Sequence, residues 1–235
     1  MKALIFDVFG TIVDWRSGVA REASLFLNRH KGHPADPAQF ADAWASRYSP
    51  AAEEVRSGRR PFTRMDVLNR ENLDTTLTEF GIDVRSIPTA ELDDLNLAWQ
   101  RLDPWPDSIS GLERLKTKFI IAPFSTGNAS MLMGMAKHAG IPWDTILGAD
   151  VVRAYKPMPD AYLRTAEFLG LPPEEVCLVA AHNDDLAAAR RCGMHTAFVP
   201  RPTEHGPSQT SDLEPLEVWD VIAEDLSDLA RLLGT

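Results

Sequence analysis

The chain has 235 residues, 44% of them hydrophobic and 25% charged, which is typical of a globular protein with one large domain or a core carrying an insertion. Its net charge of −10 argues against a nucleic-acid-binding surface. The cysteines Cys177 and Cys192 show no disulfide or metal-ligand spacing, and neither a signal-peptide pattern nor a membrane-length apolar stretch is present, so we expect a cytoplasmic protein without nucleic-acid or membrane partners.

Short apolar segments recur at wide spacing and predict buried strands. They are Ala3–Phe6, Phe119–Phe124, Val176–Ala181 and Thr196–Val199. Helix-like stretches lie between the later ones, at Ser130–Ala139, Asp160–Leu169 and Leu186–Cys192. Strands that alternate with helices favour a doubly wound α/β fold with a parallel sheet.

The interval between the first two strands differs, because its pattern from about Ser17 to Ala98 predicts helices only. Breaks in that pattern fall at "KGHPAD" (31–36) and "SGRRPF" (57–62). We therefore expect a core of residues 1–15 and 99–235, with a helical cap of residues 16–98 inserted after the first strand. Near the C-terminus, "RPTEHGPSQTSD" (201–212) is typical of an exposed loop without a functional role.

Polar side chains follow the predicted strands, at the edge where open α/β sheets bind their ligands. Asp7 and Thr11 follow the first strand, and Ser125–Asn128 follow the second. Lys156 lies in the next connection, and His182–Asp185 follow the third strand. One such residue is unremarkable, but four clusters that converge on one edge indicate a reactive site.

This order of residues resembles the haloacid dehalogenase superfamily, whose signature is a strand-end Asp with a Gly-Thr turn, then Ser or Thr, Lys and acidic residues. Its phosphatases carry a second Asp two residues after the nucleophile, whereas the 2-haloacid dehalogenase branch carries an aromatic residue, as Phe9 is here. Metal-dependent members also carry an Asp ligand where this chain has Ala181. The resemblance therefore implies a 2-haloacid dehalogenase with a Rossmann-like core and no metal or other cofactor.

The resemblance also implies a mechanism. Asp7 attacks the α-carbon of a short (S)-2-haloalkanoate or haloacetate and expels halide, and water then hydrolyses the ester on Asp7. Lys156 keeps Asp7 ionised, Ser125 and Thr11 orient it, and Asp185 positions Lys156 and helps to activate the water. The partner is a small carboxylate substrate, and a homodimer is compatible with the family.

Further residues are implied as substrate-binding or supporting groups. They are Phe9, Trp44, Arg47, Thr126, Tyr162, His182 and Asn183. Ala45 and Thr126 stand where relatives carry the Arg and Asn that hold the departing halide. Arg47, three residues after Trp44, either replaces that Arg or is a solvated arginine, and His182 is either part of the site network or a buried histidine without a chemical role.

Two alternatives to dehalogenation stay open. Asp184 adds a third carboxylate near Asp7 and Asp185, so a magnesium-dependent small-molecule phosphatase is the first alternative. The altered halide contacts suggest the second, a catalytically weakened relative that binds a small carboxylate without converting it.

Overall fold

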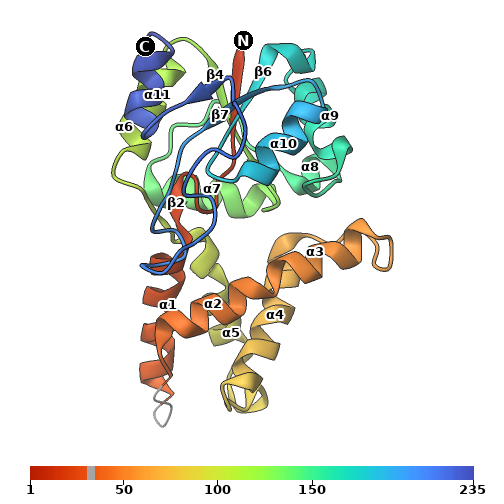
Figure 1. The fold of residues 1–235 in the computed structure, drawn as a ribbon. Coiled ribbons are helices and arrows are strands. Elements are labelled where there is room, and N and C mark those ends of the chain that lie inside the picture. Colours follow the sequence, from red (N-terminus) through yellow and green to blue (C-terminus); the bar gives the residue numbers. More distant parts are fainter. Residues whose placement is uncertain (31–34) are drawn as a thin grey trace.

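The computed structural model describes residues 1–30 and 35–235 (Figure 1). Its main sheet has six parallel strands in the order β5-β4-β1-β6-β7-β8. The strands are β1 (Ala3–Phe6), β4 (Ile120–Ser125), β5 (Leu147–Gly148), β6 (Val176–Ala180), β7 (His195–Phe198) and β8 (Val221–Ile222). The predicted parallel α/β fold is confirmed, and β1, which directly precedes Asp7, lies in the middle of the sheet.

Helices cover both faces of this sheet, because alternate side chains of its strands point in opposite directions. Leu4 and Phe6 belong to a cluster that includes residues of α6 (Ser108–Lys116), α7 (Ala129–Ala139) and α11 (Leu226–Leu232). Ala3 and Ile5 pack instead with α8, α9 and α10. These three helices are α8 (Ala149–Val152), α9 (Pro159–Phe168) and α10 (Asn183–Arg191), and the short helix η3 (Pro173–Glu175) precedes β6.

The segment between the first two long strands of the sheet is helical, as predicted, and lies at one end of the molecule (Figure 1). Its elements are α1 (Trp15–Arg29), α2 (Pro37–Ser46), α3 (Tyr48–Arg56), α4 (Met65–Glu79), η1 (Val84–Ser86), α5 (Thr89–Asn96) and η2 (Leu97–Gln100). The predicted break at 57–62 separates α3 from α4, whereas the break at 31–36 falls mostly outside the described residues. Among the helices described here, none is long and apolar enough to cross a membrane.

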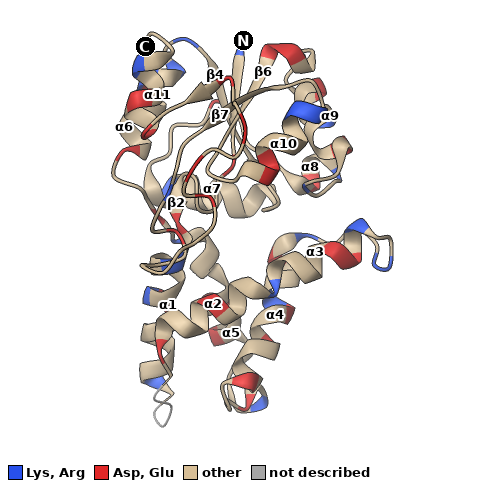
Figure 2. Cartoon of the chain, in the orientation of Figure 1, with Lys and Arg blue, Asp and Glu red and all other residues tan. Residues whose placement is uncertain are grey.

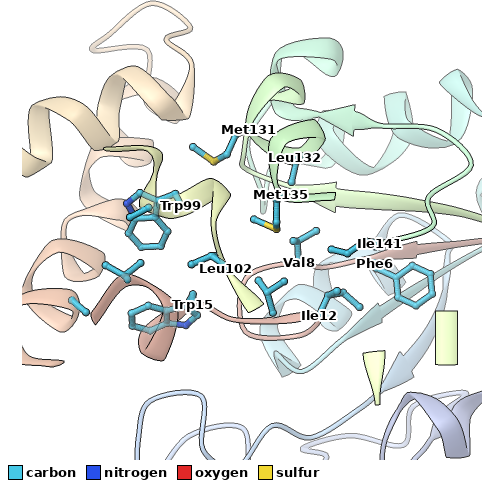
Figure 3. Packing of buried hydrophobic residues seen from close by; sticks show 14 of the residues in the cluster. Phe6, Val8, Ile12, Trp15, Trp99, Leu102, Met131, Leu132, Met135 and Ile141 are labelled. Carbon is cyan, nitrogen blue, oxygen red and sulfur yellow. The ribbon is translucent and has the colours of Figure 1, made fainter. Parts of the chain in front are cut away.

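The helical segment is joined to the sheet by two short connections that lie side by side. β2 (Val13–Asp14) pairs antiparallel with β3 (Asp103–Pro104), just where the chain enters and leaves the segment. Trp15 and Trp99 pack there with Leu102 in one apolar cluster that continues to α7 and the sheet (Figure 3). This continuous cluster holds the helical segment beside the carboxyl ends of the strands.

Candidate active site

The turn after β1 fixes the carboxylate of Asp7. The Thr11 hydroxyl donates to Asp7 Oδ2 at 2.6 Å and accepts a hydrogen bond from the Ala181 backbone at 2.9 Å. Gly10 has a φ of +87°, and a Cβ at this position would lie 2.1 Å from Glu204 Oε1. Glycine is therefore required both by the backbone angle and by the close approach of the Glu204 side chain.

Lys156 links two carboxylates at this edge of the sheet. Its Nζ donates to Asp7 Oδ1 at 2.8 Å and to Asp185 Oδ2 at 2.6 Å. The Tyr162 hydroxyl donates to the other oxygen of Asp185 at 2.6 Å, and the ring of Phe124 lies 4.5 Å below the ammonium. Asp7, Lys156, Asp185 and Tyr162, expected at one site, are therefore in direct contact.

The electrostatics of this cluster separate the two carboxylates. Burial favours a raised pKa for Asp7, but the charges and hydrogen bonds of Lys156 and His182 outweigh it and hold the pKa well below its ordinary value. Burial raises the pKa of Asp185, and the nearby charge of Asp7 adds to this, against the opposing effect of Lys156. Asp7 is thus the more firmly ionised group, and Asp185 is the better proton acceptor.

His182 lies between Asp7 and a second buried carboxylate, Glu204. Its Nδ1 is 3.1 Å from Asp7 Oδ2, and its Nε2 is 3.0 Å from Glu204 Oε2. The indole of Trp15 donates to Glu204 Oε1 at 3.0 Å. Burial favours a lowered pKa for His182, but the hydrogen bonds and charges of Asp7 and Glu204 raise it well above its ordinary value.

The prediction that residues 201–212 form an exposed loop is wrong for three of them, because Arg201, Glu204 and Gly206 are buried. Glu204 is 3% exposed and Arg201 is 7% exposed. The long segment after β7, which carries many acidic residues, extends to the start of α1 (Figures 1 and 2). Glu204 contacts residues far away in the sequence, so no local pattern marked it.

A cavity of about 760 Å³ lies at these strand ends, and its lining includes aromatic rings. Phe9 meets Trp99 edge to face at a centroid distance of 5.7 Å, and Trp99 stacks on Trp15 at 6.3 Å. All three rings line the cavity. Phe9 thus contributes an apolar ring to the cavity that Asp7 also lines, where an acidic residue would contribute a proton donor.

The cavity also has polar lining residues. Ser125 and Thr126 line it from the end of β4, and Tyr48 and Arg56 line it from the helical segment. Ser125 Oγ accepts from the Gly127 backbone at 3.1 Å, while Arg56 donates to the Lys156 carbonyl at 2.9 Å. Tyr48 and Arg56 were not anticipated from the sequence, since helical periodicity does not tell which polar side chain faces the sheet.

Trp44 and Arg47 do not line the cavity, contrary to expectation. The Trp44 indole is 1% exposed, donates to the Asn69 carbonyl at 2.9 Å and packs behind Trp99. Arg47 lies where α2 ends, and its guanidinium pairs with Glu79 at the end of α4. The helix break after Ser46 redirects Arg47 away from the site, so the spacing from Trp44 was misleading.

Asn183 also has a different role from the expected one. Its amide nitrogen donates to Asp212 Oδ1 and to the Glu214 carbonyl, at 2.8 and 3.0 Å. Its amide oxygen accepts from the Leu216 backbone and the Trp219 indole. Both ends of the Asn183 side-chain amide are thus engaged with the segment after β7, and the residue anchors that segment to α10.

The residues around Asp7 do not fit a magnesium ion. Both oxygens of Asp7 already face donors, and Ala181 supplies no carboxylate. Asp184 lines the cavity, but its side chain accepts a hydrogen bond from the Asp185 backbone at 2.8 Å. Within residues 1–30 and 35–235, no group of three or more His, Cys, Asp or Glu is arranged to hold a metal ion.

Arg201 anchors the segment after β7 to the turn that carries Asp7. Its guanidinium pairs with Asp107 through bonds of 2.7 and 2.8 Å, and its Nε donates to the Thr11 carbonyl at 2.9 Å. Because removing one partner of a buried pair leaves the other uncompensated, we expect Arg201→Gln to lower the free energy of unfolding by about 3 kcal/mol. Urea denaturation measures this, with the exposed Arg231→Gln as the control.

The effect of Arg201→Gln depends on pH. Burial favours a raised pKa for Asp107, but the hydrogen bonds and charge of Arg201 lower it below the ordinary 3.8. A carboxyl pKa that is lowered on folding stabilises the fold when the pH is above the pKa of the unfolded state, and this stabilisation is lost as the pH falls. The stability difference from the wild type is therefore largest near neutral pH and narrows below about pH 4. A difference that does not change with pH would contradict the ionic role of the pair.

Together, the parallel sheet, the polar residues at its carboxyl edge and the helical segment after its first strand define a hydrolase of the haloacid dehalogenase type. The family model described as a haloacid dehalogenase-like hydrolase matches residues 1–193, and the chain belongs to this family.

Three relatives show which branch is most similar. The crystal structure of the defluorinating L-2-haloacid dehalogenase Rha0230 is 52% identical with a TM-score of 0.98, covering 100% of this chain and 96% of that one. The L-2-haloacid dehalogenase PA0810 is 43% identical with a TM-score of 0.94, covering 99% and 98%. The (S)-2-haloacid dehalogenase 4A of Burkholderia cepacia is 28% identical over 238 residues, or 98% of each chain. The predicted resemblance to the 2-haloacid dehalogenase branch is confirmed.

Proposed function

We propose that this hydrolase removes halide from short (S)-2-haloalkanoic acids through an ester on Asp7, yielding a 2-hydroxy acid. One observation carries the proposal: the Asp7 side chain, bonded to Lys156, lines a cavity to which the residue two positions later contributes the ring of Phe9 rather than an acid. An alcohol leaving group needs a proton donor, whereas a halide leaves as an anion. The names of the similar dehalogenases support the same reaction.

In the proposed first step, an Asp7 oxygen forms a bond to the α-carbon while the carbon–halogen bond breaks, and the halide takes the bonding electron pair. Lys156 keeps Asp7 ionised, so the nucleophile needs no base. The rings of Phe9 and Trp99 border the apolar part of the substrate. Ser125 and Thr126, which line the cavity, hold the substrate carboxylate.

In the second step, water attacks the Asp7 carbonyl carbon and transfers a proton to Asp185. The bond between that carbon and the substrate oxygen breaks, and the departing alkoxide takes a proton from Lys156. The regenerated Asp7 returns its proton to Lys156, and Asp185 releases its proton to solvent. The balance is one water consumed and one 2-hydroxy acid, one halide and one proton formed.

The first experiment measures halide release from fluoroacetate, chloroacetate and both enantiomers of 2-chloropropionate, with and without EDTA. We expect release from the haloacetates and the (S) enantiomer, unchanged by EDTA, with the 2-hydroxy acid formed in equal amount. The comparison assay is magnesium-dependent phosphate release from p-nitrophenyl phosphate. No halide from any haloacid, together with phosphate release, would assign the site to a phosphatase, and inactivity in both assays would indicate a weakened relative.

A further inference from the structure

The two oxygens of Asp7 have different surroundings. Within residues 1–30 and 35–235, the one hydrogen-bond donor to Oδ1 is Lys156 Nζ, at 2.8 Å. Oδ2 has two neighbours, the Thr11 hydroxyl at 2.6 Å and His182 Nδ1 at 3.1 Å. The attacking oxygen must leave its donor to approach a substrate carbon, which is easier for the oxygen with one donor. Oδ1 is therefore the better nucleophile, and Oδ2 is left as the carbonyl oxygen of the ester.

The contacts of His182 define its protonation state. Nδ1 faces Asp7 Oδ2, and Nε2 faces both oxygens of Glu204, at 3.2 and 3.0 Å. Ionised carboxylates only accept hydrogen bonds, so both ring nitrogens must donate and the ring is an imidazolium. The raised pKa of His182 agrees with this geometry.

Glu204 is built into the site as the partner of that imidazolium. Its side chain is 4% exposed, lies against Gly10 and is fixed by the Trp15 indole at 3.0 Å. The positive charge of the imidazolium and the negative charge of the carboxylate cancel. The pair therefore directs a positively charged donor at Asp7 without changing the net charge of the site. A donor fixed before the reaction stabilises developing charge at no cost in reorganisation.

We infer that His182, held by Glu204, is an oxyanion donor for the second step of the proposed dehalogenation, and that the pair sets the rate of ester hydrolysis. The inference rests on the proposed function. When water adds to the Asp7 carbonyl carbon, the electron pair of the carbonyl π bond moves onto Oδ2, where His182 Nδ1–H and the Thr11 hydroxyl stabilise the negative charge. Collapse of this intermediate restores the carbonyl and breaks the bond to Oδ1, which leaves in the 2-hydroxy acid. The imidazolium keeps its proton throughout.

The test measures ester formation and ester hydrolysis separately in two variants, His182→Asn and Glu204→Gln. Glu204→Gln retains the shape of the side chain and an oxygen for the Trp15 indole but removes the charge. The assay mixes enzyme with chloroacetate, quenches rapidly, and measures the halide burst per site and the ester on Asp7 by intact-protein mass. The matched controls are His195→Asn, on β7 beside the exposed Asp220, and Glu214→Gln, an exposed position in the same segment as Glu204.

We expect both variants to retain a halide burst, to accumulate the ester beyond the wild-type level, and to release the 2-hydroxy acid on the order of 10²-fold more slowly. The controls should match the wild type. Two results overturn the inference: an equal fall of burst and turnover without ester accumulation, or wild-type turnover in folded variants. If His182→Asn does not fold, the Glu204→Gln result decides alone. Failure of the wild type to release halide would instead refute the proposed function.

Discussion

Replacing Asp7 with Asn is expected to lower halide release from chloroacetate by on the order of 10⁴-fold, because the neutral amide cannot attack the α-carbon. Asp7 is the carboxylate that Lys156 and His182 hold in its ionised form. The change preserves the volume of the side chain, and circular dichroism checks that the fold is intact. Asp160→Asn, at the surface of α9, is the matched control and should retain full activity.

Isotope labelling tests the same step without a mutation. With enzyme in excess over substrate in H₂¹⁸O, the ester route places the label on Asp7, because water attacks the carboxyl carbon and the product keeps the original Asp7 oxygen. Mass spectrometry of the peptide that contains Asp7 and of the 2-hydroxy acid measures the distribution. Label that appears in the product of the first turnover would show direct attack by water and contradict the ester mechanism.

Lys156→Met is expected to be the most destabilising single change in the site, lowering the free energy of unfolding by about 4 kcal/mol. Lys156 is the shared donor of Asp7 and Asp185, whose side chains are only 12% and 8% exposed. Without the ammonium, two buried carboxylates repel each other and one must take up a proton. Halide release is expected to fall as well, on the order of 10³-fold, because a protonated Asp7 is no nucleophile.

The pH dependence identifies the cause of this destabilisation. In the wild type, the pKa of Asp7 is lower in the folded protein than in the unfolded chain. This difference stabilises the fold at any pH above the ordinary pKa of Asp, and the stabilisation is lost as the pH falls below that pKa. In Lys156→Met the carboxyl pKa values rise, so protonation at low pH relieves the repulsion. Urea denaturation should therefore show a difference from the wild type that is larger at about pH 8 than at about pH 5.

Two further variants serve as controls for Lys156→Met. Lys137→Met, at an exposed position on α7, should leave stability unchanged within about 0.5 kcal/mol. Adding Asp185→Asn to Lys156→Met removes one of the two carboxylates and should recover part of the lost stability. A double variant as unstable as the single one would show that Lys156 acts through packing rather than charge.

The core of the fold could be predicted because its signals are local. β1, β4, β6 and β7 are apolar segments long enough to be distinguished, and they lie within one residue of the predicted bounds. β5 and β8 have two residues each and were missed, since a pattern needs several residues to be visible. The division into residues 1–15 and 99–235 with an inserted cap stays a prediction, although β2 and β3 pair at the two crossing points.

The sequence by itself determined that Asp7, Thr11, Ser125, Lys156 and Asp185 meet at one edge of the sheet. Each follows a strand or lies in a connection, and parallel strands bring their carboxyl ends to the same edge. For such residues, the topology of the sheet is sufficient to predict that they lie at the same edge. Phe9 and Ala181 were informative through the resemblance to the haloacid dehalogenase superfamily, whose phosphatases carry an acidic residue at each of these positions.

Only the tertiary structure decided the partners of these residues. Glu204 reaches His182 because Arg201 and Asn183 anchor the segment after β7, and no periodicity marks a single Glu in such a loop. The helix break at Arg47 turned that side chain toward Glu79. The positions of the longer strands along the chain follow from patterns of neighbouring residues, whereas the direction of a side chain at a helix end or in a loop depends on contacts with residues distant in the sequence.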